Sequence, residues 1–203
     1  MRARRSPLLV LACLVFTSAC SGSPARDDYV QAVLDARAAK DEMLRTAGDS
    51  PIPADKRQAA LPLPYFPPDA AYRVPAAIKP DQQSGRMIQM LTSTGKLRAT
   101  RVMGTLQFSV RGQPLALQAF AEEGSNGERL FVPFTDATTG RETYGAGRYL
   151  DLDRTSTGIY VIDFNTAYNP YCAYNPTYDC PVPPRQNRLP VEIRAGEKTP
   201  KGH

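Results

Sequence analysis

The spacing of apolar and polar residues changes character along the chain. Residues 24–47 carry apolar side chains at the spacing of an amphipathic helix. Ser23 and Pro24 are suited to its start, and Gly48 with Pro51 to its end. The expected apolar face holds Tyr29, Val33, Ala36, Met43 and Ala47. Such a helix serves either to pack against the rest of the fold or to bind a partner, and we expect packing.

A proline-rich segment follows the predicted helix. Residues 49–70 contain six prolines, which disfavour a long helix or a central strand. Leu61, Leu63, Tyr65 and Phe66 make this segment too apolar for a free linker. We therefore expect an ordered, extended connector with one helical turn at residues 55–60.

After Ala71 the apolar residues recur with a period of two. In 105–110 the residues Leu106, Phe108 and Val110 alternate with polar neighbours, which is the pattern of a half-buried strand. Turn sequences separate several such runs, and Asn126 followed by Gly127 is the strongest hairpin signal among them. The other expected strands are 72–78, 86–91, 96–103, 115–121, 129–134, 159–164 and 189–195.

These elements predict a mostly β fold. Seven or eight short strands with tight turns favour an antiparallel meander that forms a barrel or a sandwich, preceded by one N-terminal α-helix and the proline-rich connector. The length of 203 residues suits one such domain. We expect a signal peptide at 1–19, the helix and connector within 20–70, the β domain at 71–197 and a tail at 198–203.

The first 20 residues have the order of a secretory signal, with three arginines, a short apolar run and small residues before Cys20. The apolar run is too short for a transmembrane helix. The sequence around Cys20 resembles the lipobox of bacterial lipoproteins, which implies cleavage before Cys20 and lipid attachment to it. Thr17 departs from the usual leucine, so ordinary cleavage near Ala19 is the alternative. We expect a lipid-anchored protein of the cell envelope, facing the periplasm or the exterior.

Charge narrows the classes of partner. Removal of residues 1–19 takes away three arginines and no acid, which leaves 22 basic and 20 acidic residues. No run of lysine and arginine remains, and the tyrosines are not interleaved with basic residues. Nucleic acid is therefore not an expected partner. The expected partners are the membrane, through the lipid anchor, and an unknown small molecule or envelope component.

Cys13 would be removed with the signal peptide and Cys20 would carry the lipid, which leaves two cysteines in the mature chain. Cys172 and Cys180 lie in a compartment where cysteine pairs are oxidised, which predicts a disulfide between them. A zinc site needs about four nitrogen or sulfur ligands, and the only histidine is His203. We expect neither a metal nor a cofactor.

The lack of an internal histidine removes the commonest general base. An enzyme with this sequence would depend on carboxylates, tyrosine or lysine, and Asp136, Asp163 and Glu197 are the candidate acids. Asp163 lies in an otherwise apolar strand, so it must be paired, hydrogen-bonded or shifted in pKa. We expect it to bond Arg148 or backbone amides for structural reasons. Hydrolysis by a pair of carboxylates is the alternative.

Residues 144–184 hold seven of the ten tyrosines. These rings either line a binding pocket or pack the outside of a long loop. Glycine-rich and proline-rich loops at strand ends can converge on one mouth of a barrel. We therefore predict a ligand site in which Arg148 contacts Asp163 or Glu197. Its residues would be Arg148, Asp163, Asn165, Asn169, Tyr171 and Asn187.

The same region carries a recognisable series of motifs. TDATTGRETYGAGRYLDL, DFNTAYNPYCAYNPTYDCPVPPRQNRLP and IRAGEK resemble the signature of the bacterial domain of unknown function family 1684. The resemblance runs from about Phe131 to Lys198 and extends weakly back through the connector and helix. It implies a β-rich domain and no established activity. We expect a ligand-binding or structural protein of the envelope, with a histidine-free, carboxylate-based hydrolase as the alternative.

Overall fold

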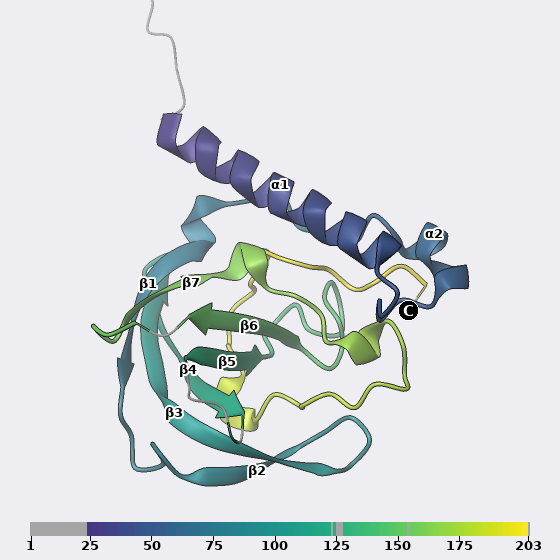
Figure 1. Ribbon diagram of the computed structural model, residues 1–203. Coiled ribbons are helices and arrows are strands. Elements are labelled where there is room, and N and C mark those ends of the chain that lie inside the picture. Colours follow the sequence, from purple (N-terminus) through teal and green to yellow (C-terminus); the bar gives the residue numbers. More distant parts are fainter. Residues whose placement is uncertain (1–23, 123, 125–127, 154, 203) are drawn as a thin grey trace, which may run out of the picture.

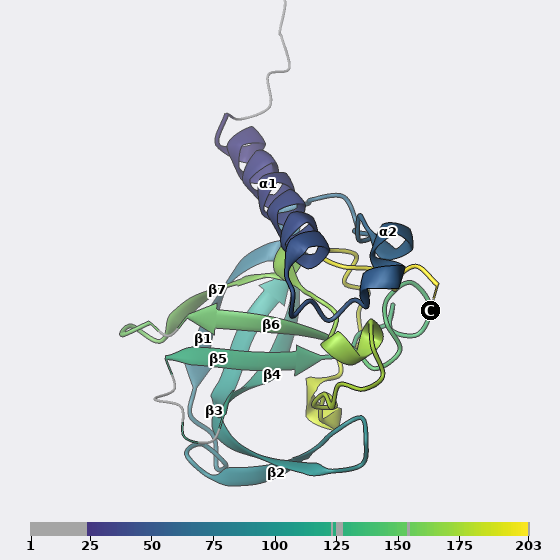
Figure 2. The same cartoon turned by 45° about the vertical axis from the view of Figure 1, so that its right-hand side comes forward.

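A computed structural model describes residues 24–122, 124, 128–153 and 155–202. One long helix lies across the end of a strongly curved, antiparallel β-sheet that is nearly closed into a barrel (Figures 1 and 2). The predicted mostly β fold is confirmed. Of the two predicted architectures, the structure has the barrel rather than the sandwich. The predicted Ser23 cap, Cys20 and the Asn126–Gly127 turn lie outside the described residues.

The helical elements precede the sheet. Helix α1 spans Pro24–Thr46, and the expected helical turn of the connector is present as a 3₁₀ turn at Ala54–Lys56 followed by α2, Arg57–Ala60. The strands are β1 Arg73–Lys79, β2 Met87–Leu91, β3 Leu97–Val110, β4 Gln113–Glu122, β5 Arg129–Phe134, β6 Arg148–Asp153 and β7 Ile159–Asp163. They pair in the order β6-β5-β4-β3-β1-β7, with β2 added alongside β3.

The main core fills the inside of the curved sheet. Alternate residues of β3 and β4 point inward, among them Leu106, Phe108 and Leu117. The pairing of β3 with β4 shifts register between Val102 and Gly104, so Val102 lies outside this core with Phe120. The expected strands 96–103 and 105–110 are therefore one long strand with an irregularity, which allows β3 to serve two clusters of buried residues.

Two strand predictions need correction. Strand β6 was not expected, although Leu150 and Leu152 alternate with acidic residues along it. The expected strand 189–195 is not a strand, because its backbone groups bond to loops and side chains. Leu189 bonds Thr135, the Val191 carbonyl accepts from Ala137, and later carbonyls accept from a buried arginine.

Helix α1 rests on the barrel through a mixture of apolar and polar contacts. Val33 and Leu44 are buried, whereas Met43, expected on the apolar face, is exposed. Asp41 is also buried and accepts a hydrogen bond from the Leu63 amide at 3.0 Å. The helix face that contacts the fold is therefore rotated from the one predicted, because polar side chains also take part in the contact.

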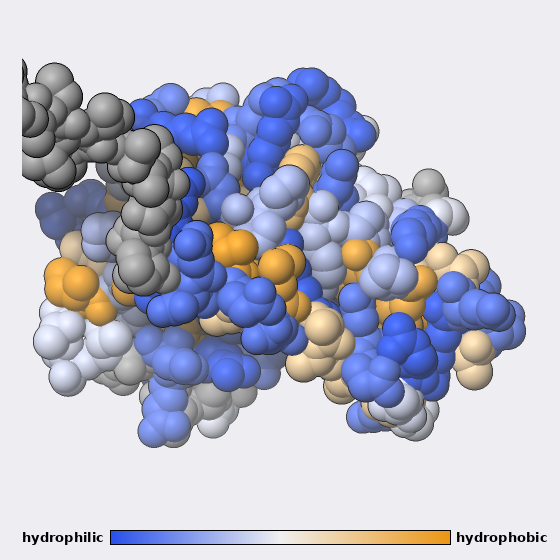
Figure 3. Space-filling model, turned by 90° about the horizontal axis from the view of Figure 1, so that it is seen from above, coloured by the Kyte–Doolittle hydropathy of each residue, from blue (hydrophilic) through white to orange (hydrophobic). Residues whose placement is uncertain are grey.

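The surface seen from above α1 is mostly hydrophilic, with hydrophobic residues in separate patches (Figure 3). Leu34 and Met43 are exposed hydrophobic residues of this helix. Among the described residues, no helix has both the length and the apolar character needed to span a bilayer.

Candidate functional site

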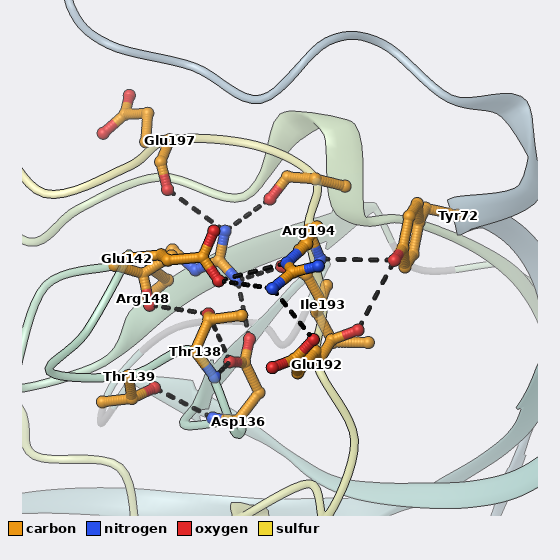
Figure 4. Close-up of polar contacts among 12 residues, drawn as sticks. Tyr72, Asp136, Thr138, Thr139, Glu142, Arg148, Glu192, Ile193, Arg194 and Glu197 are labelled. Atoms are coloured by element: carbon orange, nitrogen blue, oxygen red, sulfur yellow. Dashed lines mark hydrogen bonds and ion pairs between the residues drawn. The ribbon is translucent and has the colours of Figure 1, made fainter.

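Arg148 is the centre of the motif region. It opens β6, and its side chain is 1% exposed. The guanidinium donates to Asp136 Oδ2 at 2.7 Å, to the Ile193 carbonyl at 2.8 Å and to the Glu197 carbonyl at 3.1 Å, and it also bonds the Ala195 carbonyl (Figure 4). Burial lowers the pKa of Arg148, and the charge of Asp136 opposes that effect. The arginine therefore binds the C-terminal segment to the barrel.

The Asp136 carboxylate is held in place by the turn that it opens. Its Oδ1 accepts from both the amide and the hydroxyl of Thr138 at 2.5 Å, while its own amide donates to the Thr139 hydroxyl at 3.0 Å. The Thr138 hydroxyl also lies 3.0 Å from that of Thr143. Because aspartate readily bonds a backbone amide two residues ahead, the DATTG sequence forms this turn locally and aims Oδ2 at Arg148.

Glu197 lies in a second polar cluster, beneath α1. Its carboxylate is 1% exposed and accepts from Lys40 Nζ at 2.6 Å, the Asn169 amide at 2.7 Å and the Tyr174 hydroxyl at 2.8 Å. The Asn169 side chain donates to the Lys198 carbonyl at 2.8 Å. Burial, together with the nearby Glu197 charge, raises the pKa of Tyr174. The cluster joins the helix, the tyrosine-rich loop and the C-terminal segment.

Asp163 and Asn165 form a third cluster at the end of β7. The Tyr29 hydroxyl of α1 lies 2.9 and 2.8 Å from the two Asp163 oxygens, and the Asn165 amide donates to Oδ1 at 2.9 Å. Asn165 also exchanges hydrogen bonds with the backbone of Asp69. Arg73 approaches Asp163 at 3.9 Å. Asp163 therefore fastens the helix and connector to the sheet.

The predicted contact of Arg148 with Asp163 or with the Glu197 carboxylate is wrong. Arg148 pairs with Asp136 and reaches only the backbone carbonyl of Glu197. A buried arginine needs a carboxylate that is buried with it. The DATTG turn provides Asp136, whose Oδ2 faces Arg148 while its Oδ1 is bonded by Thr138. Asp136, Glu197 and Asn169 thus lie in two buried clusters, and Asp163 and Asn165 in a third that is partly exposed, rather than in one open mouth.

Asn187, the last amide of the predicted set, is completely buried beside β4. Its Oδ1 accepts from the Gln118 amide at 2.7 Å, and its Nδ2 donates to the carbonyls of Gln118 at 2.8 Å and Pro133 at 2.7 Å. All of these bonds involve backbone groups. Asn187 therefore fixes a 3₁₀ turn, Arg185–Asn187, to the backbones of β4 and β5.

A hollow of about 600 Å³ lies next to this turn. Gln118 and Thr105, which face each other across β4 and β3, form part of its wall. Its lining is Asp81, Gln82, Gln83, Thr105, Ala116, Gln118 and Gln186. None of these residues was predicted from sequence, although Gln118 interrupts the apolar run of β4, and a buried amide requires hydrogen-bond partners. We call this feature the amide hollow.

The tyrosine-rich segment packs largely on itself and on neighbouring loops. Tyr171, a predicted site residue, is half exposed and stacks edge-on against Tyr178 with ring centroids 5.3 Å apart. Tyr149 and Tyr168 meet in the same way at 5.8 Å and also pair through their backbones. Tyr171 lies apart from the three polar clusters, which favours the packing interpretation of these rings.

Cys172 and Cys180 are adjacent free thiols in this structure. The Cys172 amide donates to Cys180 Sγ at 3.1 Å. Hydrogen bonding from the Cys180 thiol lowers the pKa of Cys172 to about 6, while the same interaction raises that of Cys180. These opposite shifts favour Cys172 as the thiol that ionises first and that would start disulfide exchange.

We predict that protein recovered from an oxidising compartment contains the Cys172–Cys180 disulfide. Closing this short loop should stabilise the fold by about 2.5 kcal/mol on the chain-entropy model. Mass spectrometry of non-reduced peptides should show the two cysteines in one cross-linked species. Alkylation of both thiols without prior reduction would contradict the prediction.

Comparisons with known proteins agree with this architecture. A family model described as "Protein of unknown function (DUF1684)" matches residues 61–198. The solution NMR structure of the uncharacterized protein from gene locus rrnAC0354 of Haloarcula marismortui is similar, with a TM-score of 0.68 and 35% sequence identity. That similarity covers 88% of this chain and 98% of the other. No curated protein matches the chain.

Proposed function

The chain belongs to the family of proteins of unknown function DUF1684, and from its geometry we propose that it is a non-catalytic binding module anchored in the cell envelope. The amide hollow would receive the ligand, and the motif residues would hold the barrel, the C-terminal segment and α1 together. A lipid on Cys20 would supply the anchor.

The observation that carries this proposal is that each of the three candidate acids is hydrogen-bonded within the chain. Asp136 and Glu197 are buried, and each accepts hydrogen bonds from at least two groups of the chain. Asp163 is bonded by Tyr29 and Asn165. A general acid or base must reach its substrate directly or through one water molecule. Carboxylates committed to internal partners favour a structural role over hydrolysis.

The test uses a Cys20→Ala variant, so that binding through lipid is removed. This protein should sediment in a saturable manner with insoluble envelope material from the cells that produce it, and it should release no soluble fragments from that material. The Asp163→Asn variant should sediment equally well, because it preserves the shape of the side chain. Fragments released by the parent protein but not by Asp163→Asn would replace the binding proposal with the hydrolase alternative.

We predict lipid attachment at Cys20 from the order of basic, apolar and small residues before it. Metabolic labelling with a fatty-acid analogue should mark the wild-type protein and place it in the membrane fraction. The Cys20→Ala variant should carry no label, because the thiol that receives the lipid is missing. Equal labelling of the two proteins would rule out this anchor.

A further inference from the structure

We propose that the amide hollow is a carbohydrate site, which binds a neutral ligand with adjacent hydroxyl groups. This inference rests on the proposed binding function and names its ligand class. The volume of about 600 Å³ lies within the usual range of small-molecule sites, about 300 to 1,000 Å³. Three properties of the wall favour this ligand class: the way it is held in place, the hydrogen-bonding groups that it offers and the charge that it carries.

The wall is organised before any ligand binds. The Asn187 side chain hydrogen-bonds both the backbone amide and the backbone carbonyl of Gln118. The position of β4 here therefore does not depend on the Gln118 side chain. Gln186 belongs to the same 3₁₀ turn as Asn187, so its position is fixed together with that of Asn187. A buried amide therefore fixes the Gln186 side of the hollow to β4, which limits the entropy lost when a ligand binds.

The side chains form a continuous chain of hydrogen bonds across the hollow. Gln186 Nε2 donates to Gln118 Oε1 at 2.8 Å, and Gln118 Nε2 lies 3.3 Å from Gln83 Oε1 and 3.4 Å from Asp81 Oδ2. Each amide uses only part of its capacity in these bonds. Within the described residues, Gln83 Nε2 and Gln186 Oε1 make no hydrogen bond. The hollow thus offers an available donor on one side and an available acceptor on the other.

The negative charge of the lining disfavours anionic ligands. Asp81 is the one ionisable residue of the lining. It accepts from the Thr105 hydroxyl at 2.7 Å and from the Gln83 amide at 2.8 Å, and these bonds, the Thr105 bond first, lower its pKa. The carboxylate therefore stays ionised at neutral pH and disfavours an anionic ligand.

Hydroxyl groups match this wall because each one both donates and accepts. An ammonium ion only donates, so it would leave the available Gln83 donor without a partner. An apolar ligand would cover the available Gln83 donor and Gln186 acceptor without bonding them, at a cost in free energy. Neighbouring hydroxyls on a sugar ring can instead pair with a glutamine amide and an adjacent acceptor at once. The donors and acceptors of the hollow therefore favour a carbohydrate.

The experiment is a titration of the ¹⁵N-labelled Cys20→Ala protein, followed by amide chemical shifts. The probes are neutral disaccharides of glucose, mannose and N-acetylglucosamine, with N-acetylglycylglycine amide as the neutral peptide comparison. At least one disaccharide should cause saturable shifts at residues that line the hollow, including Gln83, Thr105 and Gln118. The peptide should bind at least about tenfold more weakly, since it lacks the hydroxyl groups.

Two substitutions test the wall and a third serves as the control. Gln83→Ala and Gln118→Ala should each weaken the disaccharide about tenfold, because each removes a group that bonds the ligand or positions one that does. Gln118→Ala keeps its backbone bonds to Asn187, so the fold should be retained. Gln107→Ala removes an exposed glutamine of β3 outside the lining and should leave the affinity unchanged.

The outcomes separate this inference from the proposed function. Absence of saturable binding by every disaccharide, or binding mapped away from the hollow, would overturn the carbohydrate site. Equal or tighter binding of the peptide in the hollow would overturn the ligand class and leave the binding function standing. Release of fragments from envelope material would instead remove the binding function, whatever the titration shows.

Discussion

Replacing Asp136 by alanine is expected to lower the free energy of unfolding by about 3 to 5 kcal/mol, because it leaves the buried Arg148 guanidinium without its carboxylate. The side chains of this pair are 1% and 0% exposed, so water cannot take the place of the lost charge. Domains of this size are stable by about 5 to 15 kcal/mol in total. The loss should be evident in urea unfolding followed by circular dichroism.

The matched control removes a carboxylate from an exposed arginine pair. Glu42→Ala breaks the contact with Arg45 on the surface of α1 and should leave the unfolding midpoint within experimental error. A second variant, Asp136→Ala combined with Arg148→Met, should recover part of the loss, since it removes the uncompensated charge. Equal midpoints for Asp136→Ala and Glu42→Ala would show that Arg148 does not need its partner.

Gly196→Ala should destabilise the protein by about 2 to 5 kcal/mol. Gly196 has φ of +76°, a conformation that costs other residues about 1 to 2 kcal/mol. An added Cβ would also lie 2.6 Å from the Ala167 carbonyl oxygen and 2.7 Å from that of Phe164, which requires the backbone to move. Crowding of this kind costs about 1 to 3 kcal/mol more. Thermal unfolding of the two purified proteins measures the sum.

Gly140→Ala separates these two costs. Gly140 has nearly the same φ, +79°, but an added Cβ would meet nothing within 4 Å. Its substitution should therefore show only the conformational cost of about 1 to 2 kcal/mol. If the two variants lose equal stability, then the C-terminal segment does not pack against the loop after β7 as tightly as the structure indicates.

The sequence was sufficient for the class of fold because periodicity is a local property. The alternation in 105–110 and the helical spacing in α1 follow from which face each residue buries. The expected strand 189–195 has the same alternation, yet its carbonyls serve Arg148, which lies far away in the chain. No local pattern reports such a partner.

The site was predictable only in part for the same reason. The motif residues do carry the internal polar contacts. The local sequence, however, does not indicate which of the several acids pairs with Arg148, and Asp163 was the wrong one. Asp136 prevails because its turn leaves one oxygen aimed at the barrel end. The amide hollow depends on Asn187, which brings the 3₁₀ turn Arg185–Asn187 against β4 by a contact across 69 positions of the chain. Such long-range contacts become visible only in the folded protein.

The contact between Tyr29 and Asp163 would limit the distance between the barrel and a membrane to which the chain was anchored. If Cys20 carries lipid as proposed, three residues separate it from the start of α1, and Tyr29 lies in the first turns of that helix. The four backbone steps from Cys20 to Pro24 span at most about 14 Å, and the helix from Pro24 to Tyr29 adds about 8 Å. The Asp163 end of the barrel would therefore remain within about 25 Å of the lipid headgroups. The amide hollow lies beyond the other end of β1 from Arg73, the residue that pairs with Asp163, and this strand adds at most about 25 Å. Its ligands would be limited to molecules present in the layer of the envelope within about 50 Å of the bilayer.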